Sequence, residues 1–561
     1  MWILISNQTS TMAKSISILI LSIFICQIGQ AQIQVWQHTK SKTTIQTTQW
    51  QVNDIVFSIR QQIDKPFEVR AVAKISDSTG EQQIPVFYNG DSKWVLRYSS
   101  ATIGTKTFLI ESELKELNGR KGTIDVKPST KKERHGGIIT KADNPQHLFY
   151  EDGSHYFNLA FECDWIFALD YGQTDIPKTK HLLSLLEENR FNQIVMNVYS
   201  YDVTWPKDEL LKAHPEHEYG AREDIYPFLG SNSDPDYSSL NVDFFKHFDK
   251  VISEMHDREI VSHLMIYVWN KDVKWPDMNS VADNMYYDYV VKRYQAFPNI
   301  IWDVSKEALH YERATEEYIQ ERIERIRKLD AFMRLVSVHD FGFCRRNPDM
   351  VDFISMQNWK HTLYQYMLEA RKEFKNKPIF NIEHGGYEES PYVVFPGAYD
   401  DAEACLRRNY MCLFAGGYTT YYWQGASWNV LIHNPFEQPD DFIKPHFEYF
   451  KHMRSLMDKV HFENCLPLSQ YNSSGYNLTN KKDGIVLMYV PKENNWTGAT
   501  SPIKDLFDHK EATQQWFNTL TGEFTNPEPV RMKSLQFWDE RPWEGEADAV
   551  LIVSGLKEKE K

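Results

Sequence analysis

Two glutamates in this sequence each follow a strongly apolar run, and together they could do acid-base and nucleophilic chemistry. Glu307 lies near the end of the stretch "NIIWDVSKEALH", and Glu383 follows the apolar run in "NKPIFNIEHGGYEES". Cleavage of a glycosidic bond needs one carboxyl group to protonate the leaving oxygen and a second to attack or to activate water. A single glutamate in such a position is more often a solvated loop residue or a helix cap. The presence of two such glutamates therefore suggests cleavage of a glycosidic bond, with Glu307 and Glu383 as the candidate catalytic residues.

The region from residue 141 to about 460 must position these two carboxyl groups. Eight short apolar runs in it are predicted as strands, at 155–162, 191–200, 259–268, 299–305, 334–340, 351–358, 377–383 and 417–424. Long stretches with apolar residues at helical spacing fall between them, such as 241–258 and 313–330. This alternation predicts an α/β fold with a parallel sheet, and eight units predict a (β/α)8 TIM barrel. A doubly wound sheet is the alternative, weakened because no glycine-rich nucleotide motif follows the first strand.

Polar and aromatic residues gather where the predicted strands end. Reacting groups of a barrel lie at the carboxyl ends of its strands, so these residues are the candidates for binding substrate. From the strand ends they are Asp164, Trp165, Asn197, Tyr199, Trp269, Lys306, His384 and Trp423. Aromatic faces stack on sugar rings, while amides and carboxylates hydrogen-bond hydroxyl groups, so the mixture indicates a carbohydrate. The same aromatic residues are also compatible with packing against flanking domains.

The barrel region is flanked by two regions with strand patterning. Residues 32–140 alternate in period two with turn signals, including Asn89-Gly90-Asp91 between aromatic-rich runs, and predict an N-terminal β-sandwich. Residues 461–561 return to strand patterning and predict a smaller C-terminal β-domain.

The first 31 residues are predicted to be a secretory signal peptide. Lys14 precedes the apolar run "SISILILSIFI", and the small residues Gly29 and Ala31 stand where a signal peptidase cuts. No later segment approaches the roughly 20 apolar residues that a membrane span needs. We therefore expect a mature protein that is secreted or periplasmic.

Composition limits the classes of partner and cofactor. The net charge of −15 disfavours nonspecific binding to nucleic acid or to an anionic membrane, although a local basic patch is compatible with it. After the signal segment the five cysteines form no CxxC pattern, and no H-x-x-x-H or clustered aspartates suggest a metal. We therefore expect no nucleic acid partner, no metal and no cofactor, and an oligosaccharide or polysaccharide as the substrate.

Four stretches resemble a known family. "YEDGSHYFNLAFECDWIFALDY", "LLEENRFNQIVMNVYSYD", "FPNIIWDVSKEA" and "NKPIFNIEHGGYEES" are similar to the apiosidase-like glycoside hydrolases, whose catalytic domain is a TIM barrel akin to retaining enzymes. The region before them resembles the β-sandwich that often precedes such barrels. The region after them looks like the β-domain, named for collagen binding, that often follows.

The resemblance implies roles for individual residues. It maps the acid/base onto Glu307, after the "IIW" run, and the nucleophile onto Glu383, after "KP" and an apolar run. It also adds Tyr387 to the residues that line the site. Lys306 departs from the family pattern, in which asparagine or glycine precedes the acid/base. This lysine could bind an acidic group of the substrate or lower the pKa of Glu307, and Asp303 is the alternative acid.

The sequence thus predicts an exported, retaining glycoside hydrolase that acts on a plant or algal polysaccharide or its oligosaccharides. A protein of another class, a non-catalytic carbohydrate-binding protein on a hydrolase-like barrel, is the alternative. A lyase or a phosphate or sulfate ester hydrolase is less consistent with the sequence, which has no C-x-P-x-R motif.

Overall fold

The computed structural model describes most of the chain, and the following sections concern those residues. They are 33–38, 43–201, 222–384, 401–423, 444–468, 476–494, 496–497, 507–508, 511–530, 532–533, 536–537, 539–543 and 545–559. The expected signal segment lies outside them. No helix among the described residues is both long and apolar enough to cross a membrane.

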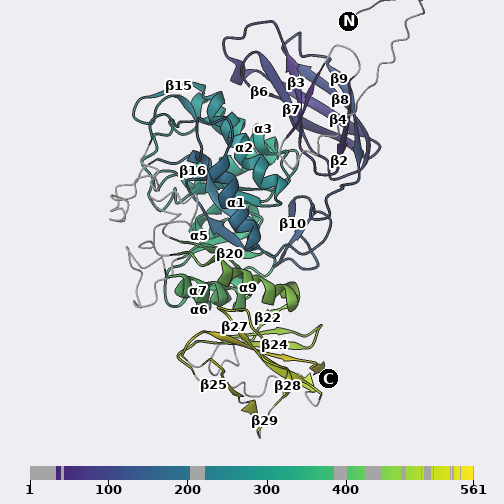
Figure 1. Ribbon diagram of the computed structural model, residues 1–561. Coiled ribbons are helices and arrows are strands. Elements are labelled where there is room, and N and C mark those ends of the chain that lie inside the picture. The colour runs from purple at the N-terminus through teal and green to yellow at the C-terminus, as the bar shows by residue number, and fades with distance from the viewer. Residues whose placement is uncertain are drawn as a thin grey trace, which may run out of the picture. The chain divides into compact units, whose positions relative to one another are not determined.

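The N-terminal part is a sandwich of two sheets, drawn in purple in Figure 1. One sheet has the order β1 (Gln34–Gln37), β3 (Asn53–Ser58), β7 (Lys93–Tyr98) and β6 (Phe87–Tyr88). The other has the order β2 (Thr43–Thr48), β9 (Lys121–Lys127), β8 (Gly104–Ser112), β4 (Ala71–Asp77) and β5 (Gly80–Pro85). Buried side chains of both sheets, such as Phe57 and Phe108, share one core. The expected hairpin joins β6 to β7, with Gly90 in the left-handed region at φ 78°.

The central part contains an eight-stranded parallel sheet. Its order is β18 (Val336–His339), β17 (Ile300–Lys306), β16 (Val261–Val268), β13 (Gln193–Asn197), β12 (Ala160–Glu162), β21 (Tyr418–Tyr421), β20 (Ile379–Glu383) and β19 (Ile354–Gln357). The last strand of the eight in the chain pairs with the first, in parallel, so the sheet curves into a nearly closed barrel. The predicted TIM barrel is confirmed, and all eight predicted strands belong to it.

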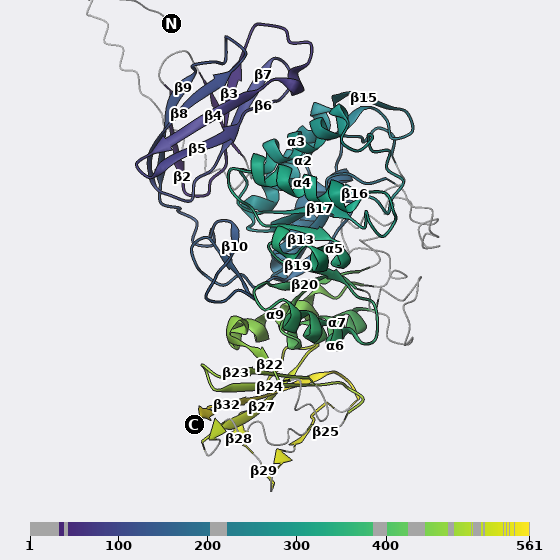
Figure 2. The same cartoon turned by 180° about the vertical axis from the view of Figure 1, so that it is seen from behind.

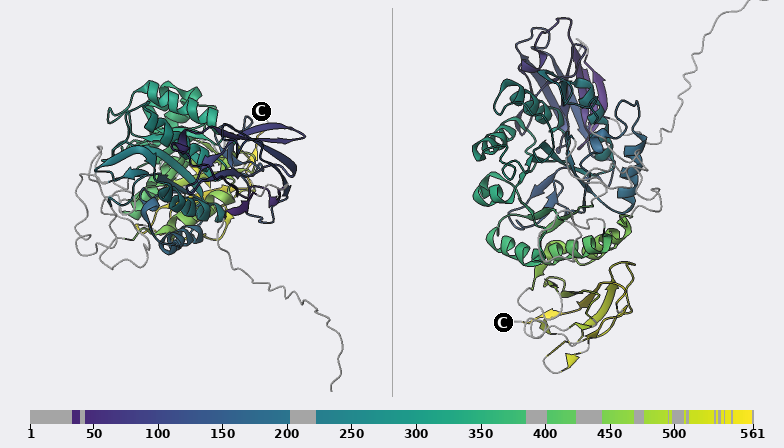
Figure 3. Two further views of the ribbon diagram at one scale, coloured as in Figure 1. Left: turned by 90° about the horizontal axis from the view of Figure 1, so that it is seen from above. Right: turned by 90° about the vertical axis from the view of Figure 1, so that its left-hand side faces the viewer.

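Helices alternate with the barrel strands and lie around them in Figures 1 to 3. They are α1 (Pro177–Glu188), α2 (Val242–Asp257), α3 (Val281–Tyr294), α4 (Glu316–Leu329), α5 (Phe341–Arg346), α6 (Leu363–Glu373), α7 (Ala402–Phe414) and α9 (Phe447–Lys459). Helix α4 shows why they form. The Thr315 hydroxyl accepts a hydrogen bond from the Tyr318 backbone N–H at its start, and Ile319, Ile323 and Ile326 are buried along one face.

The remaining elements are short or belong to the C-terminal sheet. That sheet has the order β22 (Leu466–Pro467), β23 (Tyr476–Asn480), β24 (Ile485–Val490), β32 (Ala549–Ser554), β27 (Thr513–Asn518) and β28 (Glu528–Pro529). The paired short strands are β10 (Ile138–Thr140) with β11 (Leu148–Tyr150), β14 (Phe228–Gly230) with β15 (Pro235–Leu240), β25 (Trp496–Thr497) with β31 (Asp539–Glu540), β26 (Phe507–Asp508) with β33 (Lys557–Glu558), and β29 (Met532–Lys533) with β30 (Gln536–Phe537). The 3₁₀ turns are η1 (Pro66–Glu68), η2 (Ile166–Ala168), η5 (Pro348–Met350) and η6 (Phe462–Asn464). The exact domain boundaries stay a prediction.

A buried ion cluster joins the sandwich to two barrel helices. Arg97 on β7 makes paired hydrogen bonds to Asp54 on β3, at 2.7 and 2.9 Å, and to Asp249 on α2, at 3.1 and 2.8 Å. Arg293 on α3 reaches the same Asp249 carboxylate at 2.8 and 2.6 Å. Burial opposes the charge of Asp249, but the two arginines outweigh it and lower its pKa to about 2. The cluster is thus a fully paired set of charges in a poorly solvated place.

We predict that Asp249→Asn destabilises the protein strongly, because it leaves Arg97 and Arg293 without their shared counter-charge. Loss of one partner of a buried ion pair costs about 3 to 5 kcal/mol. Because the folded pKa of Asp249 is depressed, its contribution is complete above about pH 4 and is lost as the pH falls toward 2. Urea unfolding at pH 7 measures the effect. Asp243→Asn on the exposed face of α2 is the control and should change stability by less than about 1 kcal/mol; equal effects would contradict the account.

Candidate active site

Both strands that carry the predicted catalytic carboxyls contain a β-bulge just before them. On β17, Asp303 pairs with Ser337 and Lys306 pairs with His339, so β17 holds one more residue than β18 across the same step. On β20, the pairing moves from Asn381 to Glu383 while β19 advances by a single residue. A bulge bends its strand and changes the direction of a side chain, and bulges are common next to active sites. The two bulges therefore aim the groups at the ends of β17 and β20.

Glu307 follows β17 in a left-handed backbone conformation, with φ 58°. A residue other than glycine pays a steric cost there, because its Cβ approaches the following carbonyl oxygen. Such strain persists where the surroundings fix it, and it clusters at functional sites. Here the Glu307 backbone N–H donates to the His339 carbonyl at 3.3 Å, which ties the strained residue to the end of β18.

Lys306 points its ammonium group among three carboxyl groups. Its Nζ lies 2.6 Å from Glu162 Oε1, 3.5 Å from Asp164 Oδ2 and 3.1 Å from Glu383 Oε2. The Lys306 side chain is 1% exposed. Burial opposes its charge, but the carboxylates of Asp164, Glu162 and Glu383 outweigh burial and raise the pKa of Lys306 well above its ordinary value. Lys306 is therefore a permanent positive charge whose contacts are carboxyl groups of the protein itself.

The ionisation of the two catalytic candidates is governed first by burial. Burial raises the pKa of Glu383 to about 7, with Lys306 opposing the shift and Glu307 adding to it. Burial also raises the pKa of Glu307, against the opposing charge of Lys306. Lys306 thus lowers the pKa of Glu307, as the sequence suggested, but burial outweighs it: the net shift of the pKa is upward, which favours a proton donor.

Gln357 at the end of β19 binds the Glu383 carboxyl. Its Nε2 donates to Glu383 Oε1 at 2.9 Å. The fifth strand adds His339, whose Nε2 lies 3.6 Å from Glu383 Oε2. Burial lowers the pKa of His339 well below its ordinary value, so this ring is neutral beside the carboxyl pair. Gln357 and His339 thus both lie beside the Glu383 carboxyl.

Asp303, the alternative acid, is engaged elsewhere. It is fully buried, and its Oδ1 accepts hydrogen bonds from the backbone N–H groups of Ser305 and His339 at 3.2 and 3.0 Å. Its Oδ2 lies 3.1 Å from His263 Nε2. These contacts hold the bulge and the end of β18, so the geometry favours Glu307 over Asp303 as the acid.

Three predicted binding residues carry buried polar atoms that lack a partner among the described residues. They are both amide atoms of Asn197 at the end of β13 and the indole nitrogens of Trp269 and Trp423. Buried polar groups in native proteins are nearly always hydrogen-bonded, so each such group calls for a water or a ligand. An amide and two indole donors suit a ligand with many hydroxyl groups.

The other predicted binding residues occupy varied positions. Asp164 follows β12, fully buried, and its Oδ2 lies 3.8 Å from Lys271 Nζ, which stands 5.4 Å from the Trp165 ring. The Tyr199 ring packs among aromatic neighbours such as Phe167 and Trp275, and His384 Nε2 lies 2.7 Å from Thr419 Oγ1. Tyr387 lies outside the described residues. Asp164 therefore joins the charge cluster, whereas Tyr199 and His384 have supporting contacts.

Three residues near the catalytic pair were not predicted. They are His339 on the fifth strand, Lys271 after the third, and Tyr311, whose pKa is raised to about 12 first by burial and then by Glu307 and Glu383. The rule that strand ends carry the site would have found His339, since it is the last residue of β18. Lys271 and Tyr311 lie on loops several residues beyond a strand, where sequence pattern gives no direction for the side chain.

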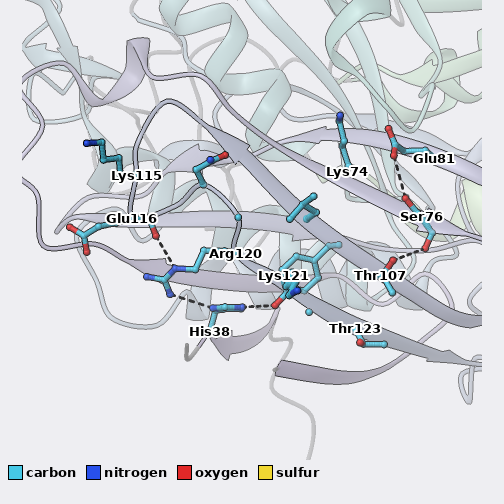
Figure 4. A pocket seen from close by; sticks show the side chains of 15 residues that line it. His38, Lys74, Ser76, Glu81, Thr107, Lys115, Glu116, Arg120, Lys121 and Thr123 are labelled. Atoms are coloured by element: carbon cyan, nitrogen blue, oxygen red, sulfur yellow. Dashed lines mark hydrogen bonds between the residues drawn. The ribbon is translucent and has the colours of Figure 1, made fainter. Parts of the chain in front are cut away.

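A hollow of about 1030 Å³ also exists on the N-terminal sandwich (Figure 4). Its polar groups pair with one another: the His38 ring lies 3.0 Å from the Lys121 carbonyl, and Ser76 donates to Glu81 at 3.4 Å. Glu116 and Glu81 stand at opposite ends of it in Figure 4. No carboxyl pair faces a common point there, so the chemistry belongs to the barrel.

Comparison with known proteins agrees with this site. Residues 142–435, more than half of the chain, match the family described as apiosidase-like, catalytic domain. The chain belongs to the apiosidase-like family. Residues 46–113 match a domain of unknown function, DUF5060, and no curated protein matches the chain. Family membership and fold together support a glycosidase, which is what the paired carboxyls of the barrel also indicate.

Solved structures similar to this apiosidase-like chain share its fold. One from Bacteroides vulgatus ATCC 8482, assigned as a glycoside hydrolase, has a TM-score of 0.72 at 18% identity and covers 92% of this chain and 100% of its own. A glycoside hydrolase family 5 structure from the same strain has a TM-score of 0.54 at 16% identity, covering 75% of this chain and 93% of its own. At these identities the likeness concerns the fold alone.

We predict that glycine is more stable than alanine at position 307. The left-handed backbone of Glu307 costs a Cβ-bearing residue about 1 kcal/mol or more, which glycine avoids, so Glu307→Gly should exceed Glu307→Ala in stability by about 1 kcal/mol. Thermal unfolding of the two variants gives the difference. At Glu324, exposed within α4, the order should reverse, because glycine in a helix costs about 1 kcal/mol relative to alanine. The same order at both positions would refute the strain at Glu307.

Proposed function

We propose that this protein is an exported, retaining glycoside hydrolase that cleaves glycosidic bonds in a plant or algal polysaccharide or in its oligosaccharides. The observation that carries the proposal is the burial of Glu307 and Glu383 together at the carboxyl ends of β17 and β20, near enough for the charge of Glu307 to raise the pKa of Glu383. The fourth and seventh strands of the barrel thus supply a buried pair of carboxyls with raised pKa values, the set of groups that glycosidic cleavage needs.

The resemblance of this barrel to a family akin to retaining enzymes supports retention of configuration. Retaining enzymes hold their carboxyl groups about 5 to 5.5 Å apart, whereas inverting enzymes leave about 6.5 to 9.5 Å for a water molecule. Retention requires direct attack by a carboxylate on the sugar, a role that the resemblance gives to Glu383.

The proposed reaction has two steps. In the first, a Glu383 oxygen attacks the anomeric carbon while Glu307 gives its proton to the leaving glycosidic oxygen, so a covalent glycosyl ester forms and the first product departs. In the second, the Glu307 carboxylate takes a proton from water, the water oxygen attacks the anomeric carbon, and Glu383 leaves as a carboxylate. Glu307 is thus acid, then base.

The binding groups support a carbohydrate substrate, and the contacts of Lys306 bear on whether that substrate is acidic. The amide of Asn197 and the indoles of Trp269 and Trp423 offer buried hydrogen-bonding atoms suited to hydroxyl groups. Lys306 was a candidate for binding an acidic group of the substrate. Its ammonium contacts Glu162, Asp164 and Glu383, so it acts on the protein's own carboxyls. The site therefore suits a neutral sugar at the cleavage point as well as an acidic one.

We predict that purified protein from Gln32 onward releases sugar from at least one member of a panel of plant and algal oligosaccharides, neutral and acidic. Mass spectrometry detects release, and proton NMR of the first product should show the anomer of the substrate. Glu307→Gln should lower the rate by about 10² to 10⁴, because proton transfer to the leaving group is lost. Glu383→Gln should abolish turnover, because the nucleophile is lost.

Glu317→Gln, an exposed glutamate on α4, is the matched control and should retain full activity. The opposite anomer in the first product would contradict retention. Binding of a glycan without release, equal in all four proteins, would contradict the enzymatic proposal and favour a carbohydrate-binding protein.

Export is part of the proposal and has its own test. The apolar run after Lys14 and the small residues Gly29 and Ala31 support cleavage after Ala31. We predict that protein expressed from the full sequence in a Gram-negative host is recovered from the periplasm or medium with Gln32 as its first residue, read by N-terminal sequencing. Intact Met1 on protein retained in the cytoplasm would contradict export.

A further inference from the structure

The Lys306 ammonium is held by carboxyl groups that the proposed reaction does not consume. Glu162 Oε1, at the end of β12, lies 2.6 Å from Lys306 Nζ, and Asp164 Oδ2 lies 3.5 Å from the same nitrogen. The bulge in β17 brings Lys306 to this place. Glu162, Asp164 and Lys306 have side chains that are at most 1% exposed, so water cannot substitute for these contacts.

The same ammonium lies 3.1 Å from Glu383 Oε2. Among the described residues, the titratable groups around Glu383 besides Lys306 include Glu307, Asp164, Glu162, Lys271, His339 and Tyr311. Burial disfavours the ionised form of Glu383 most, and the charges of Glu307 and Asp164 disfavour it further, so all three raise its pKa. His339 and Tyr311 are neutral near pH 7, because burial lowers the pKa of the first and raises that of the second. Lys271 pairs with Asp164 at 3.8 Å.

We propose that Lys306 is a positioning residue of the reaction, clamped by Glu162 and Asp164 so that its ammonium stabilises the Glu383 carboxylate as the nucleophile. The inference rests on the proposed function, since it assigns a device that the nucleophile of that reaction requires. Lys306 itself transfers no proton, because the surrounding carboxylates keep it charged. It acts through Glu383 by charge, across the 3.1 Å between Nζ and Glu383 Oε2.

The expected consequence is a defined acid limb of the pH-rate profile. Glu383 works as a carboxylate, and its pKa is about 7, so kcat/KM should fall as the pH drops below about 7. An opposite charge within about 4 to 6 Å shifts a carboxyl pKa by about 1 to 3 units. Lys306→Met should therefore move the limb upward by at least about 1 pH unit. Asp164→Asn removes a negative charge beside Glu383 and should move the limb downward.

The experiment measures kcat/KM from pH 4 to 10 for the wild-type protein and these two variants, on the oligosaccharide that the wild type cleaves. Lys106→Met is the matched control. Lys106 is a buried lysine paired with Asp77 in the sandwich, so its loss tests the general cost of removing a buried ammonium. Lys106→Met should lower the melting temperature and leave the acid limb in place. Shifts of opposite sign for Lys306→Met and Asp164→Asn support the proposal, and a limb unchanged in both overturns it.

A second readout needs no substrate and separates this inference from the proposed function. Protein labelled with carbon-13 at the glutamate carboxyls is titrated by NMR, and the Glu383 signal is assigned by its loss in Glu383→Gln. In Lys306→Met the Glu383 midpoint should rise by about 1 unit or more. An unchanged midpoint overturns the inference even if hydrolysis is observed, whereas a raised midpoint supports it even if no glycan tried is cleaved. If Lys306→Met does not fold, the Glu383 midpoint in Lys306→Gln, which keeps a polar group in the place of the ammonium, decides in the same way.

Discussion

The site depends on one constraint, the burial of several charged side chains at the carboxyl ends of the barrel strands. Four carboxyl groups, Glu162, Asp164, Glu307 and Glu383, are buried there with the ammonium groups of Lys271 and Lys306. An isolated charge is too costly to bury, so each must be paired or lose its charge. The two lysines cannot compensate four carboxylates, and burial accordingly raises the pKa of Glu162, Glu307 and Glu383. The site thus holds protons near neutral pH, as acid-base chemistry requires.

Backbone geometry decides which groups share this charge. The bulges in β17 and β20 each insert one residue before the end of a strand. Without the first, the alternation of the strand would place Asp303 and Lys306 on opposite faces of the sheet. With it, Asp303 binds His263 and the end of β18, while Lys306 reaches Glu162 across the barrel. The left-handed Glu307 continues the same distortion, so local strain here is linked to the position of the proposed acid.

Much of this architecture follows from the sequence. The eight apolar runs and the helical periodicity between them predicted the barrel, because burial on both faces leaves a clear pattern. The strand-end rule also pointed to Glu307, Glu383 and Asp164, which the structure buries at the carboxyl ends of the strands. It did not reveal the bulges, since one extra residue in a buried strand leaves no mark in an apolar run. The partners of Lys306 were therefore unpredictable, and a lysine that contacts three carboxyls looked like a group for binding an acidic substrate.

In the proposed reaction, Glu383 is the residue that bonds to the sugar. Trapping shows this most directly: the protein is incubated with a panel of 2-deoxy-2-fluoro glycosyl fluorides, and the peptide that gains the mass of a fluorosugar is located by mass spectrometry. The account predicts one adduct per chain, on Glu383, formed slowly or not at all in Lys306→Met near pH 7. An adduct on Glu162 or Glu307, with Glu383 unmodified, would contradict the assignment of the nucleophile.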